Sequence, residues 1–146
     1  MNESIVYTNS LDHVTPEHLH GFFVDWPNPP SAQTHLRLLK ASRHVVLALN
    51  KHNLNVVGFI TAISDGVLCA YIPLLEVLPS YQGQGIGTKL VEKMLDTLNG
   101  LYMIDLLCDQ PLQNFYQKHH MEKATGMIIR NRAKQSGAAY SSNQVK

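Results

Sequence analysis

The sequence predicts a single α/β domain built on a mixed β-sheet. Two runs rich in β-branched residues, 44–50 and 55–64, are joined by a polar stretch and predict a hairpin. An Asp-Gly pair, a strong turn signal, then leads into the apolar run 67–78, so we expect a third antiparallel strand. The apolar run 101–108 follows a stripe of apolar residues at helical spacing, which predicts a parallel strand after a right-handed crossover.

Length and charge limit the class of protein. The 146 residues suit one compact domain, expected over residues 1–132, with a polar and disordered tail over residues 133–146. Lys and Arg total 12 against 11 Asp and Glu, without a block of like charges, so neither nucleic acid nor a membrane is expected as a partner. The N-terminus lacks the pattern of a signal peptide, and no apolar run approaches the ~20 residues that span a bilayer, so we expect a cytoplasmic protein.

Cysteines and histidines give no sign of a disulfide or metal site. Cys69 and Cys108 lie in apolar runs and form no CxxC pair, so they are expected to be small core residues. The eight histidines are scattered, and their one adjacent pair lies at a predicted helix end. A covalent acyl-cysteine route is disfavoured because buried cysteines are usually inert.

The first third of the chain predicts a strand and two helices. The strand is expected at 4–8. Thr15 as N-cap and Pro16 at the first helical position predict a helix that ends by Trp26. The following proline-rich loop cannot be helical, and Ser31 then caps a second helix.

The run 67–78 is apolar at both alternating sets of positions, which predicts a central strand covered on both faces. Pro73 within it predicts a bulge, or a point where pairing on one side stops. Further on, a helix is expected from Ile86 to about Leu98. A second is expected from about Pro111 to His119, and a terminal strand near 127–130.

The segment QGQGIG separates the central strand from its helix. Three glycines in alternation exceed what a tight turn with close packing requires, whereas a glycine-rich turn at a helix start can hold an anion. The dinucleotide pattern GxGxxG fails because Thr88 stands where the third glycine belongs, and the pattern GxxxxGK[ST] is also absent.

With its flanks, the segment V-x-P-x-Y-Q-G-x-G-I-G-x-x-L resembles the pyrophosphate-binding segment of the GNAT superfamily of N-acyltransferases. The predicted order of elements over about residues 3–131 also resembles that fold. Downstream, Phe115-Tyr116 and Lys118 match the family pattern, whereas Asp109 replaces its usual Asn and His120-Met121 replace Gly-Phe.

The resemblance implies a mixed sheet of about six or seven strands, helices on both faces and a splayed pair of parallel strands that admits acetyl-CoA. No metal is implied. The amide of Val77 would polarise the thioester carbonyl. The coenzyme-binding residues implied are Leu75, Val77, Gln82, Gly83, Gln84, Gly85, Ile86, Gly87, Thr88 and Tyr116.

Two residues are candidate catalysts. The resemblance implies that Tyr116 protonates the departing thiolate, although it could also be a core aromatic residue. Glu76, the only acid in the run 67–78, is a candidate proton acceptor, or a carboxylate that reaches solvent or a basic partner. Tyr71 is a weaker candidate base. Asp109 ahead of Pro111 is more typical of an N-cap than of a ligand.

The sequence therefore predicts direct transfer of an acetyl group from acetyl-CoA to a primary amine in a ternary complex. The acceptor, a small molecule or a peptide, is expected opposite the coenzyme, walled by the first two predicted helices and the loop 26–30. The protein is expected to be a monomer or homodimer. Two alternatives remain at this point: a non-catalytic acyl-CoA-binding sensor or scaffold, and a nucleotide-binding α/β domain.

Overall fold

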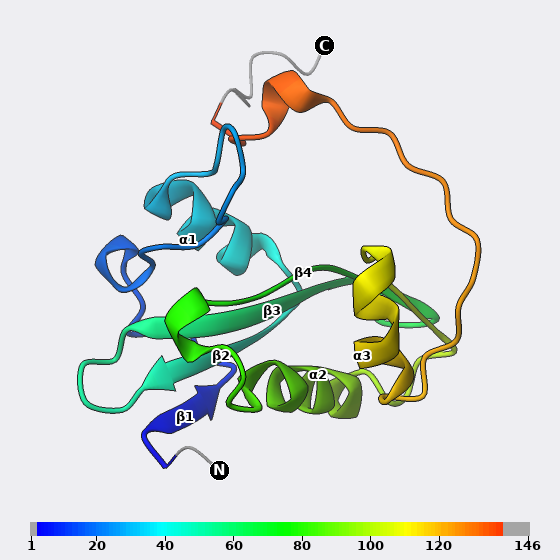
Figure 1. The fold of residues 1–146 in the computed structure, drawn as a ribbon, viewed down its shortest axis with the longest axis horizontal. Helices are drawn as coiled ribbons and strands as arrows, with labels where there is room; N and C mark the ends of the chain where they lie inside the picture. Colours follow the sequence, from blue (N-terminus) through cyan, green and yellow to red (C-terminus); the bar gives the residue numbers. More distant parts are fainter. Residues whose placement is uncertain (1–2, 139–146) are drawn as a thin grey trace.

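The computed structural model describes residues 3–138 and contains one five-stranded mixed sheet. Its strands are β1 (Ile5–Thr8), β2 (His44–Asn50), β3 (Val56–Ser64), β4 (Cys69–Val77) and β5 (Met103–Asp105), and its helices are α1 (Ala32–Ala41), α2 (Ile86–Thr97) and α3 (Gln113–Gln117). The strands lie side by side in chain order. Neighbours are antiparallel as far as β4, and β4 and β5 are parallel (Figure 1).

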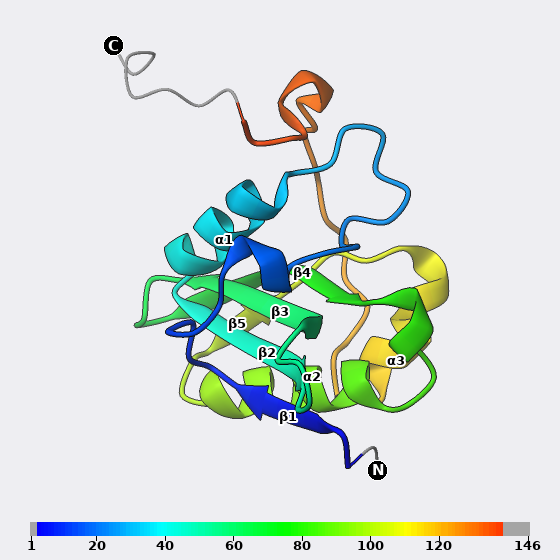
Figure 2. The same ribbon diagram turned by 90° about the vertical axis from the view of Figure 1, so that its left-hand side faces the viewer.

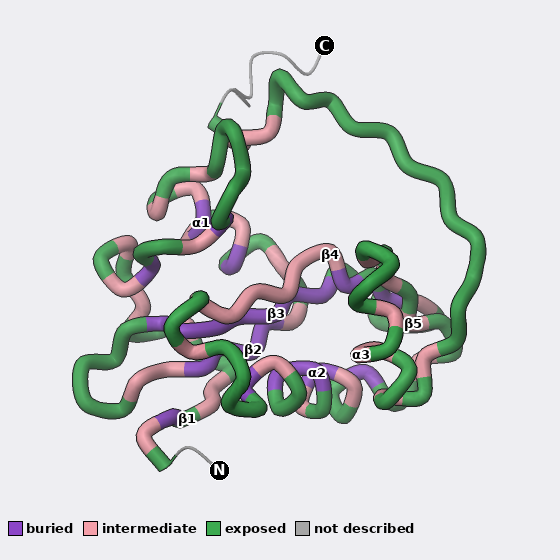
Figure 3. The backbone as a smooth tube through the Cα atoms, in the orientation of Figure 1, coloured by how far each residue is buried: buried purple, intermediate pink, exposed green. Residues whose placement is uncertain are grey.

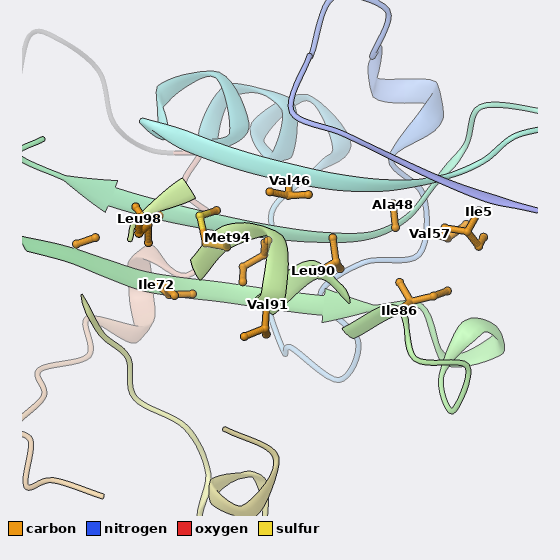
Figure 4. Close-up of a cluster of buried hydrophobic side chains, with 13 residues drawn as sticks. Ile5, Val46, Ala48, Val57, Ile72, Ile86, Leu90, Val91, Met94 and Leu98 are labelled. Carbon is orange, nitrogen blue, oxygen red and sulfur yellow. The ribbon is translucent and has the colours of Figure 1, made fainter. Parts of the chain in front are cut away.

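Helices cover both faces of this sheet, as predicted, with α1 on one side and α2 on the other (Figure 2). On α2 the predicted apolar stripe packs against the strands, and its residues Leu90, Val91 and Met94 are fully buried (Figure 4). Truncation of such a buried leucine to alanine typically costs ~2–5 kcal/mol of stability, so this face contributes strongly to the fold.

The opposite face buries α1 together with an aromatic cluster. Ser31 caps α1 as predicted, because its hydroxyl accepts the Thr34 N–H at 3.1 Å. The ring of His35 lies 4.5 Å from that of Phe59 and 4.9 Å from that of Phe23, centroid to centroid. The His35 side chain is 1% exposed, and its Nε2 atom has no hydrogen-bond partner.

Pro73 produces both of its predicted effects. Thr61 pairs with Leu74 but Ile63 pairs with Tyr71, so β4 carries one extra residue at the proline. Pairing between β4 and β5 also ends at Tyr71, opposite Asp105. Among the described strands, none pairs with this edge of β4 beyond that point, so the parallel pair is splayed.

The prediction of a helix between Thr15 and Trp26 is wrong. Only a short 3-10 helix forms, at Pro16–His18. The chain then turns through residues with positive φ, 86° at Gly21 and 60° at Phe23, which a right-handed helix cannot contain.

The C-terminal half also differs from the prediction. The expected strand 101–108 is reduced to β5, and the expected strand near 127–130 does not form because that segment lies exposed, away from the sheet. The sheet therefore has five strands in the described part of the chain, against the six or seven expected. The expected helix 111–119 is a 3-10 turn followed by the short α3.

The tail expected to be disordered is structured as far as Ala138, and the rest of that prediction falls on residues outside the described range. Residues 132–134 form a 3-10 helix. Gln135 accepts the Asn28 N–H at 2.8 Å, and the Arg37 guanidinium donates to the Gly137 carbonyl at 2.6 Å. These bonds attach the tail to α1 and to the loop that precedes it.

Cys69 and Cys108 are free and half-buried, so the prediction that they are core residues is wrong. Cys69 lies at the start of β4 and Cys108 lies beyond the end of β5. None of the helices within residues 3–138 is long and apolar enough to cross a membrane.

Candidate active site

The splayed half of β4 presents unpaired backbone groups. The Leu78 N–H donates to the Val57 carbonyl at 2.8 Å, which fixes the alternation of hydrogen bonds between β3 and β4. By that alternation the amides of Leu75 and Val77 point away from β3, toward the edge that β5 leaves open. An extended ligand could therefore pair with this edge as another strand would.

The glycine segment lies directly beyond this edge. Gly83 and Gly85 have φ of 76° and 81°, in the left-handed region that favours glycine. A Cβ atom at either residue would meet no protein atom within 4 Å, so the space beside the loop is open. Gly85 is the N-cap of α2, and the first-turn amides after it have no acceptor within the helix. This arrangement fits a pyrophosphate group.

Two glutamine side chains fasten the loop. The side-chain amide of Gln82 donates to the Val77 carbonyl at 3.0 Å. The backbone N–H of Gln82 donates to the Pro79 carbonyl at 3.3 Å. The side-chain amide of Gln84 donates to the Ser80 carbonyl at 3.4 Å. These contacts hold the loop against the end of β4.

α3 brings Tyr116 to the same region. Its Phe115 ring lies 3.8 Å from where a Cβ at Gly87 would stand, so α3 packs on the first turn of α2. The rings of Phe115 and Tyr116 meet edge to face, with centroids 4.9 Å apart. Burial, and secondarily the electrostatic interaction with nearby Cys108, raises the pKa of Tyr116 to about 12. The phenol is therefore protonated across the physiological range.

A comparison of the sequence with known protein families agrees with these features. Residues 11–121 match the acetyltransferase (GNAT) family. The chain belongs to the GNAT family. As such it is an N-acyltransferase that uses an acyl-CoA cosubstrate.

Solved GNAT structures resemble the whole domain. A candidate acetyltransferase from Deinococcus radiodurans R1 is 40% identical, with 92% of this chain and 93% of that chain covered and a TM-score of 0.89. A GNAT family acetyltransferase from Streptococcus pneumoniae TIGR4 is 30% identical, with coverage of 88% and 98% and a TM-score of 0.70. Glucosamine-6-phosphate N-acetyltransferase from Arabidopsis thaliana, at 14% identity and a TM-score of 0.64, with coverage of 88% and 98%, shares the fold alone.

In this GNAT domain the half-buried Glu76 carboxylate bonds to backbone N–H groups, and within residues 3–138 it forms no ion pair with a basic side chain. One carboxylate oxygen accepts the Phe23 N–H at 2.7 Å, and the other accepts the Val24 N–H at 3.2 Å. The carboxylate thus fixes the loop after Gly21, a contact that sequence reasoning missed because 53 residues separate Glu76 from Phe23.

The other two polar candidates lie apart from Glu76. Tyr71 stands before the Pro73 bulge and is 37% exposed. Asp109 occupies the N-cap position of the 3-10 turn that leads to α3, but its side chain makes no capping hydrogen bond. Within residues 3–138, no group of three His, Cys, Asp or Glu side chains could hold a metal ion.

A cavity of about 740 Å³ opens on the α1 side of β4. Its lining is mostly apolar, and Leu74 links it to β4 two residues before Glu76. Trp26 and Pro30 line it together with residues of α1, which are among the walls that the sequence analysis expected for an acceptor, whereas the lining by the tail was not expected. The remaining lining residues are Phe23, Thr34, Arg37, Leu38, Ala41, Gln135 and Gly137.

Proposed function

We propose that this enzyme transfers an acetyl group from acetyl-CoA to a primary amine by direct attack in a ternary complex. The observation that carries the proposal is the unpaired half of β4 directly beside an open glycine loop. The strand edge suits the amide-bearing arm of coenzyme A, and the loop suits its pyrophosphate. Both donor contacts come from one continuous stretch of chain.

The loop binds the donor through its backbone. Amides from Gly83 to Thr88, including those of Gln84 and Ile86, surround the pyrophosphate at the N-terminus of α2, where the helix dipole favours negative charge. Gln82 keeps the loop in place. Leu75 and Val77 pair with the coenzyme arm, and the Val77 amide stabilises negative charge on the thioester oxygen as the amine attacks.

Tyr116 supplies the acid. Bound acetyl-CoA contributes a thioester, whose cleavage releases a thiolate. A phenol with its pKa raised to about 12 retains its proton at neutral pH and can give it to that thiolate. Its partly buried position beside Phe115 keeps it near the first turn of α2.

The acceptor enters from the cavity on the α1 side. Phe23, Trp26 and Leu74 give this cavity an apolar wall, which suits an amine with an apolar or aromatic body, whether a small molecule or a peptide. Glu76 takes the amine proton, directly or through water, with lone pairs that its two N–H bonds leave free.

A thiol-release assay with acetyl-CoA across an amine panel tests the proposal. Phenylalkylamines and peptides with apolar N-termini should be acetylated faster than polyamines or aminoglycosides. Replacement of Trp26 by Ala should raise the KM for the amine and leave the KM for acetyl-CoA unchanged. If no amine released thiol, the proposed acetyl transfer would be wrong.

A further inference from the structure

The cavity on the α1 side of β4 contains a single charged side chain. Of its described lining residues, only Arg37 is charged, and Thr34 and Gln135 supply uncharged polar groups. The others are glycine or residues with mainly apolar side chains. Ligand cavities are typically apolar, with a few polar groups that fix the orientation of the ligand. The charge of Arg37 therefore indicates the chemistry of one end of the ligand.

α1 presents this arginine to the cavity on a stripe of its own. The cavity residues of α1, at positions 34, 37, 38 and 41, follow the i, i+3, i+4, i+7 spacing of one helix face. The buried residues of α1, His35 and Leu39, lie on the side that packs on the sheet. Figure 3 shows the helix alternating between buried and more exposed residues. Arg37 is among the exposed ones, so it lines the cavity and takes no part in the core.

The charge of Arg37 has no counterpart among the described residues. Its guanidinium donates to the Gly137 carbonyl at 2.6 Å, and this neutral acceptor orients the group without balancing its charge. No carboxylate within residues 3–138 forms an ion pair with it. A guanidinium has five N–H donors in one plane, arranged to bind a carboxylate through two parallel hydrogen bonds. Most of these donors are available to a ligand.

The carboxylate of Glu76 adjoins the same cavity from β4. Side chains alternate along a strand, so Glu76 points to the same face as Leu74, which lines the cavity. One Glu76 oxygen accepts the N–H of Phe23, which is also a lining residue. The space thus extends from an acid on β4 to a cation on α1, with an apolar wall between them. An acceptor with an amine at one end and an anion at the other matches both ends.

A carboxylate matches this cavity better than a phosphate does. A phosphate monoester carries about −1.5 to −2 charge at neutral pH, whereas the described lining offers one positive charge. The volume of about 740 Å³ is that of a site for a drug-sized ligand, so an apolar body fits between the amine and the carboxylate. Phe23, Trp26 and Leu74 provide the apolar surface for that body.

We propose that the acceptor is an amine whose apolar body ends in a carboxylate, and that Arg37 binds this carboxylate. The inference rests on the proposed function, because it assigns the far end of the amine that is acetylated. Arg37 contacts the substrate away from the reacting atoms, so it determines specificity and does not take part in the chemical step. Polyamines and aminoglycosides lack the carboxylate and place extra positive charge beside Arg37.

Matched acids and amides test the carboxylate in the native enzyme. One pair is 4-(aminomethyl)benzoate and 4-(aminomethyl)benzamide, and the other is the dipeptide leucyl-phenylalanine and its C-terminal amide. Within each pair the body is the same and only one member is an acid. We expect kcat/KM for thiol release to be at least about tenfold higher with the acid in one pair or both, since hydrogen bonds between charged groups are the strong ones. The pair that responds distinguishes a small-molecule acceptor from a peptide.

Substitutions of Arg37 locate the preference. In Arg37→Met the value of kcat/KM for the acid should fall about tenfold, to the level of the amide, and the KM for acetyl-CoA should stay unchanged. Arg37→Lys keeps the charge without the planar fork and should retain part of the preference. The matched control is Arg43→Met, at an exposed arginine that lies beside Gly66 and does not line the cavity, and it should keep the native preference.

Fluorescence of Trp26 measures binding without turnover. Trp26 is the only tryptophan in the chain and lines the cavity, so a ligand there should change its emission. In the native protein the Kd for 4-(aminomethyl)benzoate should be at least about tenfold lower than for the benzamide, and the two values should be equal in Arg37→Met. This titration needs neither acetyl-CoA nor a catalytic step.

The results separate this proposal from the proposed acetyl transfer. Equal Kd values for acid and amide, a preference that survives in Arg37→Met, or tighter binding of 4-(aminomethyl)phenylphosphonate than of the benzoate would each overturn the carboxylate site. If no amine released thiol while the acid still bound more tightly than the amide, acetyl transfer would be wrong and the carboxylate site would stand.

Discussion

Tyr116 is the residue on which the proposed chemistry depends most directly. In the proposed reaction its phenol delivers the proton that the departing thiolate needs. Replacement by Phe keeps the ring and its edge-to-face contact with Phe115 but removes that proton. We expect kcat to fall ~10²- to 10⁴-fold, with little change in the KM for acetyl-CoA, as measured by steady-state thiol release.

The matched control is Tyr102→Phe, the same change at a tyrosine that is 83% exposed on the sheet edge. Its kcat should equal that of the native enzyme. If Tyr116→Phe also kept native kcat, the tyrosine would be a packing residue and not the acid.

His35 links the stability of the fold to pH. Burial lowers its pKa from 6.5 to about 4, so the unfolded chain binds the proton first as the pH falls. Its contribution to stability is complete above pH 6.5 and is lost as the pH falls toward 4. We expect His35→Phe to remove about 2 kcal/mol of the decrease in unfolding free energy between pH 7 and pH 4.5, measured by urea denaturation.

An exposed histidine provides the comparison for this measurement. His52→Phe should keep the pH dependence of the native protein, since His52 lies on the surface. Equal pH dependence in His35→Phe and the native chain would show that His35 does not govern acid stability.

Among the elements, β4 positions the loop after Gly21 through one side chain, because Glu76 accepts the Phe23 and Val24 N–H groups. In Glu76→Gln one of these donors faces an NH₂ group and loses its acceptor. We expect the free energy of unfolding to fall by about 1 to 3 kcal/mol in urea denaturation.

Glu92→Gln is the control for this substitution. Glu92 makes an exposed ion pair with Lys89, at 3.6 Å, which should be worth at most about 1 kcal/mol. Similar losses in both variants would argue against a specific role of Glu76 in holding the loop.

The elements that the sequence predicts well are those determined by neighbouring residues. The Ser31 cap of α1 and the apolar stripe of α2 could both be predicted, because the residues that determine each lie within a few helical turns of one another. Pro73 interrupts pairing for a reason intrinsic to proline. The expected first helix fails because Glu76, far away in the chain, supplies acceptors that favour a different backbone path.

The candidate site also has one part made of neighbouring residues and one part that only folding brings together. The glycine loop and the strand before it are contiguous, so the residues proposed to bind the donor could be named from the sequence alone. The cavity proposed for the acceptor joins Arg37 of α1, Leu74 of β4 and Gln135 of the tail, which are brought together only by folding. No spacing in the sequence indicates that these three residues share one cavity.

At the scale of the whole molecule, the expected strand near 127–130 is the most informative difference. Its residues have the character of a strand, yet the described chain provides no neighbour for it. A sequence pattern reports the tendency of a segment to pair and does not report which chain provides the partner.

Ligand binding should act on the whole fold by mass action. Acetyl-CoA at ~100 times its dissociation constant adds ~2.7 kcal/mol to the unfolding free energy, or roughly 6–10 °C in Tm for a domain of this size.

We expect Gly85→Ala to lose most of this Tm shift in a thermal-shift assay. A Cβ there would project into the space proposed for the pyrophosphate, and the left-handed backbone would cost alanine ~1–2 kcal/mol. Gly100→Ala, which has open space and no positive φ, should keep the shift. An equal shift with ATP or NAD would contradict a loop adapted to acyl-CoA.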